Sequence, residues 1–205
     1  MKIDTCVVGP IETNCYIVED AGETIVIDPG DQPLLIMDAL AGREIKEIIV
    51  THYHWDHLSA LSALQEATGA RAAMSQKDAD RVDGVSRLDS FDIDRGHGAP
   101  RIDRRLSEGD EVTVGECVFK VIETPGHTPG SICLYCAEQQ TLFSGDTLFA
   151  DGRHGRTDFV DGSQRAMVDT LVNKFIDVSD DTRVYPGHEH SSTMARERKL
   201  NSHLR

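Results

Sequence analysis

Long hydrophobic runs, a secretory leader and a cysteine framework are all lacking in this sequence. No apolar stretch approaches the ~20 residues that a transmembrane helix requires. The N-terminal stretch MKIDTCVVGPIETN has no basic segment followed by an apolar one, so we expect no signal peptide. The 5 cysteines are scattered and odd in number, which argues against a disulfide scaffold. Together these features predict a cytoplasmic protein.

Positive charge is also scarce. The chain has 21 Lys and Arg against 35 Asp and Glu, which gives a formal net charge of −14. Such a surface repels the phosphates of nucleic acids and of anionic lipids, and the arginines form no basic stripe. We therefore expect neither a nucleic-acid partner nor a membrane partner, and the partner expected is a small molecule.

The composition is sufficient for a folded core. Hydrophobic residues make up 39% and charged residues 27% of the 205 residues, which is typical of globular chains rather than disordered ones. No sequence repeat, low-complexity tract or linker divides the chain. We therefore expect a single domain over residues 1–205.

Short apolar runs separated by turn residues alternate with segments of helical periodicity. The irregular stretch 83–105 and the Gly- and Asp-rich stretch 145–161 are expected to be loops, the former exposed. In the helix expected at 164–176, Phe175 and Ile176 would both point inward. The expected strands are 14–19, 24–28, 47–51, 71–74, 111–114, 117–123, 131–136, 141–144 and 183–185, and the other expected helices are 34–40, 58–68, 76–82 and 192–200. This alternation predicts an α/β fold of two mixed sheets with helices outside.

Four side chains that bind transition metals follow directly after the apolar run 47–51. In the sequence HYHWDH, His52 and His54 are two residues apart, so an extended chain places both on one side. Asp56 and His57 follow where the chain turns into a helix, which presents them from a second direction. Imidazole and carboxylate groups are good ligands of zinc and iron. The pattern therefore predicts a metal site at the end of this strand.

Three further potential ligands occupy comparable places in the sequence. His127 in TPGHTPG, Asp146 in SGDT and His188 in YPGH each follow an expected strand. Functional sites in α/β folds are built at the carboxyl ends of strands. We therefore expect these three side chains to join the histidine-rich segment in one metal centre.

The motifs THYHWDH, TPGHTPGS, FSGDTLF and YPGHEH resemble those of the metallo-β-lactamase superfamily, over nearly the whole chain. Within it, the sequence is most similar to the short, single-domain relatives of glyoxalase II, the hydroxyacylglutathione hydrolase type, which share GRTD and GHE…ERKLN. The resemblance implies an αββα sandwich of two mixed β-sheets, with a two-metal site on one edge.

The resemblance also implies two divalent metal ions, zinc in the first place, with iron or manganese as alternatives. Asp28, in the sequence IDPG, matches a family position that supports the HxHxDH segment by contacting its imidazoles. The implied ligands are His52, His54 and His127 for the first ion, Asp56, His57 and His188 for the second, and Asp146 as the bridge between them.

The charges of such a centre indicate a hydrolase. Two cations ~3.5–4 Å apart acidify a shared water, and the resulting hydroxide attacks an acyl carbonyl. A thioester is a natural substrate, because its thiolate has a pKa near ~8.5 and leaves without a strong general acid. Asp56 is the candidate catalytic residue, since it would orient the nucleophile while binding the metal. We therefore expect a thioesterase.

Several related activities form the alternatives. Glyoxalase II carries a C-terminal helical domain that binds glutathione, and only 17 residues follow His188 here, so we expect no such domain and leave the thiol carrier open. Zinc β-lactamases place Cys where this chain has Asp146. Persulfide (sulfur) dioxygenases share the GRTD-like stretch and use one iron on the equivalents of His52, His127 and Asp146. This dioxygenase activity and a lactonase activity are the alternatives to a thioesterase.

Three other features have a simpler interpretation. Cys133 and Cys136 form a CxxC, but residues three apart on a strand point to opposite faces, so we interpret both as structural. Arg156 and Asp158 either contact the site or form a surface ion pair that braces their loop. The remaining histidines are expected to be solvated side chains: His97, His154, His190 and His203.

Overall fold

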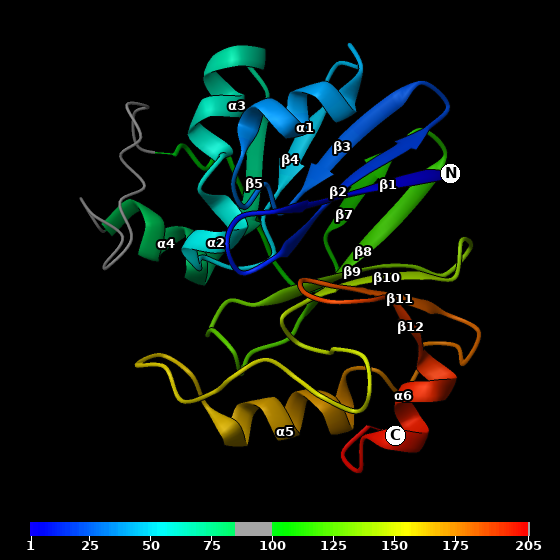
Figure 1. Cartoon of the computed structure of the whole chain (residues 1–205). Coiled ribbons are helices and arrows are strands. Elements are labelled where there is room, and N and C mark those ends of the chain that lie inside the picture. The colour runs from blue at the N-terminus through cyan, green and yellow to red at the C-terminus, as the bar shows by residue number, and fades with distance from the viewer. Residues whose placement is uncertain (85–99, 205) are drawn as a thin grey trace. The chain divides into compact units, whose positions relative to one another are not determined.

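The computed structural model describes residues 1–84 and 100–204. The chain divides into two compact units. Unit 1 comprises Met1–Leu106 with Val114–Glu116, and unit 2 comprises Ser107–Thr113 with Cys117–Arg205. Two six-stranded sheets are formed, and Figure 1 shows the helices that flank each of them. No helix in the described part of the chain is long and apolar enough to cross a membrane.

The sheet of unit 1 is mixed. Its first three strands are antiparallel neighbours, and the strands that follow are parallel to the third. In sheet order the strands are β1 (Lys2–Val8), β2 (Thr13–Asp20), β3 (Glu23–Ile27), β4 (Glu47–Ile49), β5 (Arg71–Ser75) and β6 (Arg104–Leu106).

The central parallel strands of this sheet are almost wholly apolar. Ile25, Ile27 and Ile49 are buried, as expected for strands covered on both faces. Because β3 and β4 run in parallel, their carboxyl ends lie at the same edge of the sheet. Asp28 follows one of these strands and His52 follows the other after a short connection, so the topology itself brings both residues to that edge.

The helices of unit 1 are α1 (Pro33–Leu40), α2 (Trp55–Leu58), α3 (Leu61–Thr68) and α4 (Gln76–Gly84). In Figure 1, α1 and α3 lie side by side beside the sheet, and residues of the two helices are in contact. The end of α3 at Gly69 is as expected, since this residue takes a φ of 71° and donates to the carbonyl of Gln65.

The expected helix 58–68 is divided, which corrects the sequence prediction. The main-chain N–H of Ala60 donates to the carbonyl of Pro29, at 3.0 Å, instead of continuing the helix. Ser59 Oγ also donates to the carbonyl of Trp55, at 2.6 Å. The segment Pro29–Gly30 thus interrupts the helix from outside, and a contact between residues so far apart in the chain leaves no mark on local periodicity.

Unit 2 contains the second sheet and two helices. Its strands β10 and β11 are parallel, whereas β8, β9 and β10 form an antiparallel series. The strands in sheet order are β12 (Ser192–Thr193), β11 (Arg183–Pro186), β10 (Thr141–Gly145), β9 (Ile132–Cys136), β8 (Cys117–Glu123) and β7 (Glu111–Val114), and the helices are α5 (Gln164–Asn173) and α6 (Met194–Leu200). Met167 and Leu171 of α5 and Met194 of α6 pack into one apolar core with strand residues such as Leu142 and Val184.

Other differences from the sequence prediction have local causes. β1 was not expected, because this edge strand is only partly buried and lacks a clear apolar alternation. Helix α5 ends at Asn173, so Phe175 is buried as expected but Ile176 is 61% exposed. The C-terminal helix begins at Met194, because the Thr193 hydroxyl accepts a hydrogen bond from the N–H of Arg196 and caps it.

The stretch 83–105, expected to be a loop, is described only in part. Its last two residues belong to strand β6, which pairs with β5 in parallel. Residues 85–99 lie outside the described residues. The expectation for 145–161 agrees with the structure beyond Gly145, the last residue of β10.

Replacing Gly30 by Ala tests the contact that divides the helix. A Cβ at this position would lie 1.7 Å from the carbonyl oxygen of Asp56, which is backbone and cannot swing aside. We expect Gly30→Ala to lower the free energy of unfolding by about 3 kcal/mol, measured by urea denaturation. The control is Gly22→Ala, where a Cβ meets nothing within 4 Å and only the positive φ costs about 1 kcal/mol. Equal losses in the two variants would contradict this interpretation.

Candidate metal centre

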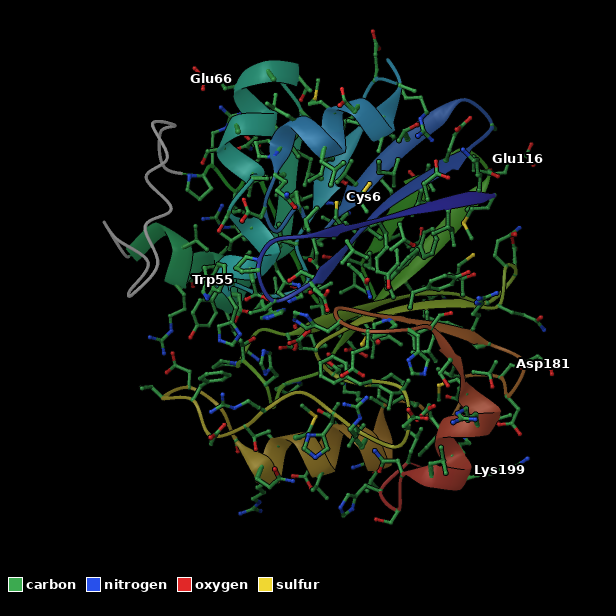
Figure 2. The ribbon with its side chains drawn as sticks, in the orientation of Figure 1. Cys6, Trp55, Glu66, Glu116, Asp181 and Lys199 are labelled. Carbon is green, nitrogen blue, oxygen red and sulfur yellow. The ribbon has the colours of Figure 1, made fainter. Side chains whose placement is uncertain are left out.

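The histidine loop, defined here as residues 51–57, carries four potential ligands of unit 1. It leaves β4 in extended form, and α2 begins within it at Trp55, which Figure 2 labels. Asp56 and His57 therefore lie in a helical turn, while His52 and His54 precede it. The side chains of His52, Asp56 and His57 are buried, and that of His54 is partly exposed.

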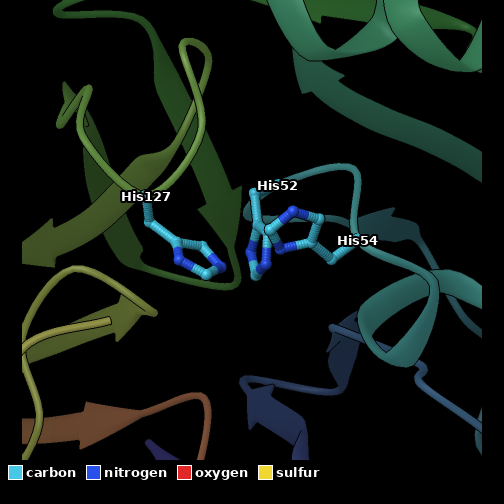
Figure 3. Close-up of side chains that lie close together, drawn as sticks. All are labelled: His52, His54 and His127. Carbon is cyan, nitrogen blue, oxygen red and sulfur yellow. The ribbon is translucent and has the colours of Figure 1, made fainter. Parts of the chain in front are cut away.

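The four side chains lie within reach of one another. Figure 3 shows the imidazoles of His52 and His54 side by side, with ring centroids 4.8 Å apart. A ring nitrogen of His52 also lies within 4.8 Å of one of His57. Asp56 Oδ2 is 3.2 Å from His57 Nε2. Unit 1 thus gathers three imidazoles and one carboxylate at the edge where its parallel strands end.

Asp28 supports this loop from the end of β3. Its Oδ1 accepts the main-chain N–H of Thr51 at 2.7 Å, and its Oδ2 lies 2.8 Å from His57 Nδ1. Because an ionised carboxylate only accepts, His57 Nδ1 carries the proton and donates it. A neutral His57 then has its lone pair on Nε2, which is the form that binds a metal. Asp28 itself has a φ of 52°, a left-handed conformation that aspartate tolerates better than most residues.

Two residues that hold the histidine loop were missed by the sequence analysis. Thr13, at the start of β2, donates its hydroxyl to Asp56 Oδ2 at 3.1 Å. Asp78 in α4 accepts the main-chain N–H of Tyr53 through Oδ2 at 3.0 Å. Both side chains are buried. They lie 43 and 25 residues from their partners along the chain, so no local pattern could have indicated either contact.

Unit 2 gathers the other three expected ligands around one carboxylate. His127 lies in the turn after β8, Asp146 directly after β10, and His188 shortly after β11. Asp146 Oδ2 is 3.4 Å from Nε2 of His127 and 3.7 Å from Nε2 of His188. Figure 3 shows the imidazole of His127 projecting from its loop. The same nitrogen atom of each imidazole, Nε2, therefore faces the carboxylate.

The stretch GRTD, residues 155–158, orients His127 through its main chain. The carbonyl of Arg156 accepts from His127 Nδ1 at 2.7 Å, which again leaves the lone pair of a neutral imidazole on Nε2. Gly155 permits the close approach, because a Cβ there would lie 2.1 Å from the carbonyl oxygen of Asp146 and 3.0 Å from His127 Nδ1. The hydrogen bond between His127 and Arg156 therefore uses only one side chain, that of His127, and a main-chain carbonyl.

The side chains of the same stretch form an exposed ion pair. Arg156 donates from Nε and a terminal nitrogen to the two oxygens of Asp158, at 2.9 and 2.8 Å. Both side chains are about two-thirds exposed, at 68% and 67%. The second interpretation from the sequence, a surface pair that braces the loop, therefore describes these side chains, and the main chain of Arg156 is what contacts a candidate ligand.

The loop between Asp146 and α5 is also anchored by Glu197 of α6. This buried carboxylate accepts the main-chain N–H groups of Gly152, at 2.6 Å, and of Asp151, at 3.3 Å, as well as the hydroxyl of Ser192. Gly152 lies against the main chain of Leu200, 2.9 Å from where its Cβ would be. The C-terminal segment ERKLN, residues 197–201, thus anchors the loop that follows Asp146.

The CxxC of β9 has the properties of a structural pair. Both thiols are buried and free. Burial raises the pKa of the Cys133 thiol to about 12, so that it stays protonated at neutral pH and is a poor metal ligand. Cys133 Sγ donates to the carbonyl of Ser144 at 3.4 Å and thereby supports the strand that leads to Asp146.

The remaining histidines make local contacts. His154 Nδ1 lies 2.8 Å from the carbonyl of Gly155. His190 is 64% exposed at its side chain and lies 3.7 Å from Asp151, so it is largely solvated as expected. His203 is partly exposed, and His97 lies outside the described residues.

The chemistry of the seven side chains fits divalent transition metals. Five imidazoles and two carboxylates form a nitrogen- and oxygen-donor set that suits zinc, iron or manganese. In His57 and His127 the proton is held on Nδ1 by a fixed acceptor, so Nε2 is available for coordination. Within each unit the donors stand close enough to share an ion.

Comparisons with known proteins identify the family. Residues 8–195 match the metallo-β-lactamase superfamily. An uncharacterized protein of Aquifex aeolicus is 34% identical over 98% of this chain and 96% of its own length. A hydroxyacylglutathione hydrolase of Cereibacter sphaeroides is 38% identical over 88% of this chain, and the match covers 64% of that relative. The crystal structure of TTHA1623 in a di-iron-bound form has a TM-score of 0.84 at 31% identity, covering 98% of this chain and 100% of the other.

The chain therefore belongs to the metallo-β-lactamase superfamily, as the motifs indicated. Its two mixed sheets flanked by helices are the fold of that superfamily. This membership places the protein in a superfamily of metallo-hydrolases and agrees with a centre for divalent metals.

Removal of metal should be visible in the fluorescence of Trp55. This is the only tryptophan of the chain, it is partly buried, and it stands between His54 and Asp56. Without a cation, the imidazole and carboxylate on either side of Trp55 lose the ion that draws them together, so the surroundings of the indole change. We expect the emission maximum or intensity to change when metal is chelated and to recover when zinc is added. An emission spectrum that is the same before and after complete chelation would contradict a metal in contact with this loop.

Proposed function

We propose that the protein is a dinuclear metal-dependent thioesterase. The donor count is the observation that carries this proposal. Unit 1 contributes four side-chain ligands and unit 2 contributes three, whereas a single zinc or iron ion uses about three to five from the protein. Seven donors are sufficient for two ions that share a carboxylate. The proposal requires the two units to present their ligands to the same pair of ions.

The proposed distribution of ligands follows the family motifs. Unit 1 supplies imidazoles to both ions, and the carboxylate of unit 2 that faces two imidazoles is the natural bridge. The first ion would be held by His52, His54 and His127, the second by Asp56, His57 and His188, and Asp146 would contribute to both. When bound, two such ions acidify a shared water and neutralise negative charge that develops on a carbonyl oxygen.

The residues of the chain prepare this chemistry before a substrate arrives. Asp28 and the carbonyl of Arg156 hold the Nδ1 protons of His57 and His127, so these imidazoles need not reorient. The Thr13 hydroxyl donates to one oxygen of Asp56, which keeps that carboxylate in a defined direction. We propose that Asp56 both binds the second ion and accepts a hydrogen bond from the attacking water, orienting it toward the acyl carbon.

A thioester is the proposed class of substrate. The thiolate that leaves has a pKa near ~8.5 and departs at neutral pH without a proton from the protein. One relative is named hydroxyacylglutathione hydrolase, which supports an acylated thiol as the small molecule bound. The chain spans only 64% of that relative's length, so the relative does not determine which thiol carries the acyl group. The first thioester to test is S-lactoylglutathione.

Substitution of the second-ion ligands tests the proposal. Asp56→Ala and His188→Ala should each lower thioesterase activity at least ~10²-fold, because each removes a ligand of one of the two charges that stabilise the oxyanion. Metal analysis should show fewer than two ions per chain. Asp38→Ala and His190→Ala are matched controls at exposed positions and should retain activity and metal content.

A different outcome would identify the alternative activity. A persulfide dioxygenase needs only one iron, so Asp56→Ala and His188→Ala would then retain iron and most oxygen consumption. If the wild-type protein consumes oxygen with glutathione persulfide and hydrolyses no thioester, the thioesterase proposal is wrong. The assignment of the chain to its superfamily would be unaffected by that result.

A further inference from the structure

Thr51 lies between Asp28 and His52 and has no role in the proposed function. Its hydroxyl Oγ1 is 2.7 Å from Asp28 Oδ2 and 3.1 Å from His52 Nδ1. Its main-chain N–H donates to the other oxygen of the same carboxylate, at 2.7 Å. The side chains of all three residues are buried. The hydroxyl is therefore held between a carboxylate and an imidazole, away from solvent.

The direction of these hydrogen bonds follows from the number of protons. A threonine hydroxyl has one proton, and an ionised carboxylate has none. The proton of Thr51 Oγ1 therefore points to Asp28, at the shorter of the two distances. The hydroxyl oxygen can then only accept from His52, so the ring proton of His52 sits on Nδ1 and its lone pair on Nε2.

The same carboxylate thus acts on two imidazoles. Asp28 Oδ2 accepts from His57 Nδ1 directly, at 2.8 Å, and from the Thr51 hydroxyl, which in turn accepts from His52. Three donors in all face the Asp28 carboxylate, which offsets the cost of burying its charge. A hydroxyl that donates to a carboxylate is also a stronger acceptor, because hydrogen bonds in a chain polarise one another.

We propose that Thr51 is a positioning residue that fixes His52 in its Nδ1–H tautomer and so presents Nε2 for metal binding. Asp28 would thereby set the tautomer of one imidazole for each of the two proposed ions, directly for His57 and through Thr51 for His52. This inference rests on the proposed metal centre but is independent of the substrate. Contacts of this kind, one step behind the ligands, are typically worth 10- to 100-fold in metal affinity.

The tautomer of His52 can be measured in the wild-type protein without any substitution. Long-range ¹⁵N–¹H correlation NMR of the metal-free protein at a pH where imidazoles are neutral distinguishes a protonated Nδ1 from a protonated Nε2. We expect His52 and His57 both to show the proton on Nδ1. A wild-type His52 with its proton on Nε2 would overturn the proposal, whatever the enzyme's substrate.

Substitution separates this role from mere packing. Thr51→Val keeps the shape but removes the hydroxyl, and we expect zinc affinity, measured by competition with a chelator, to fall 10- to 100-fold. The His52 signals should also show loss of the single Nδ1–H tautomer. Thr51→Ser retains the hydroxyl and should restore both properties. Thr24→Val, at a buried threonine of β3, is the matched control and should change neither.

The outcomes also distinguish this inference from the proposed function. If Thr51→Val binds zinc as tightly as the wild type and keeps the Nδ1–H tautomer, Thr51 has no positioning role, even if thioesterase activity is present. If the wild type shows the expected tautomer and Thr51→Val the expected loss of zinc affinity, but no thioester is hydrolysed, the thioesterase proposal fails and the role of Thr51 stands. Should Thr51→Val not fold, the wild-type NMR measurement and Thr51→Ser still decide.

Discussion

The buried carboxylate of Asp28 is the group on which the geometry of the histidine loop depends. It stands where β3 ends, and it accepts hydrogen bonds from the main chain of Thr51, from the Thr51 hydroxyl and from His57. A single charge in the interior is costly unless several donors surround it, so the same contacts that satisfy Asp28 also tie the loop to the sheet. The parallel pairing of β3 with β4 brings the two chain segments to one edge and makes this arrangement possible.

In unit 2 the acceptor that fixes a ligand imidazole is a neutral group instead of a carboxylate. The main-chain carbonyl of Arg156 holds Nδ1 of His127, and Gly155 lets that segment approach Asp146 closely. A carbonyl has no charge to bury, and its position is determined by the path of the loop rather than by a side chain. The Arg156 guanidinium is consequently left to pair with Asp158 at the surface. The loop is also held by Glu197, which connects it to the last helix.

Superfamily membership and the chemistry of the candidate site are two separate lines of evidence. The match over residues 8–195 shows the fold and the membership of a superfamily of metallo-hydrolases. The donors and the hydrogen bonds behind them explain why the motif residues are of these types: imidazoles need a fixed Nδ1 acceptor, and bridging needs a carboxylate. One relative of similar length has a crystal structure in a di-iron-bound form. Imidazole and carboxylate donors in general suit zinc, iron and manganese. The substrate depends on residues beyond these donors.

The sequence by itself determined most strands and helices of both units and the residue types expected at a metal centre, because apolar periodicity and closely spaced ligands are local signals. The strands β1, β6 and β12 were not among those expected. The sequence did not reveal the break between Leu58 and Leu61, which depends on Pro29 and Gly30, nor the contact of Thr13 with Asp56. It also left open how Arg156 acts, since its main chain and not its side chain contacts His127. These features arise from groups distant in the chain or from backbone atoms that every residue has. Only the tertiary structure could decide them, because no residue type marks where a carbonyl or a remote hydroxyl will lie.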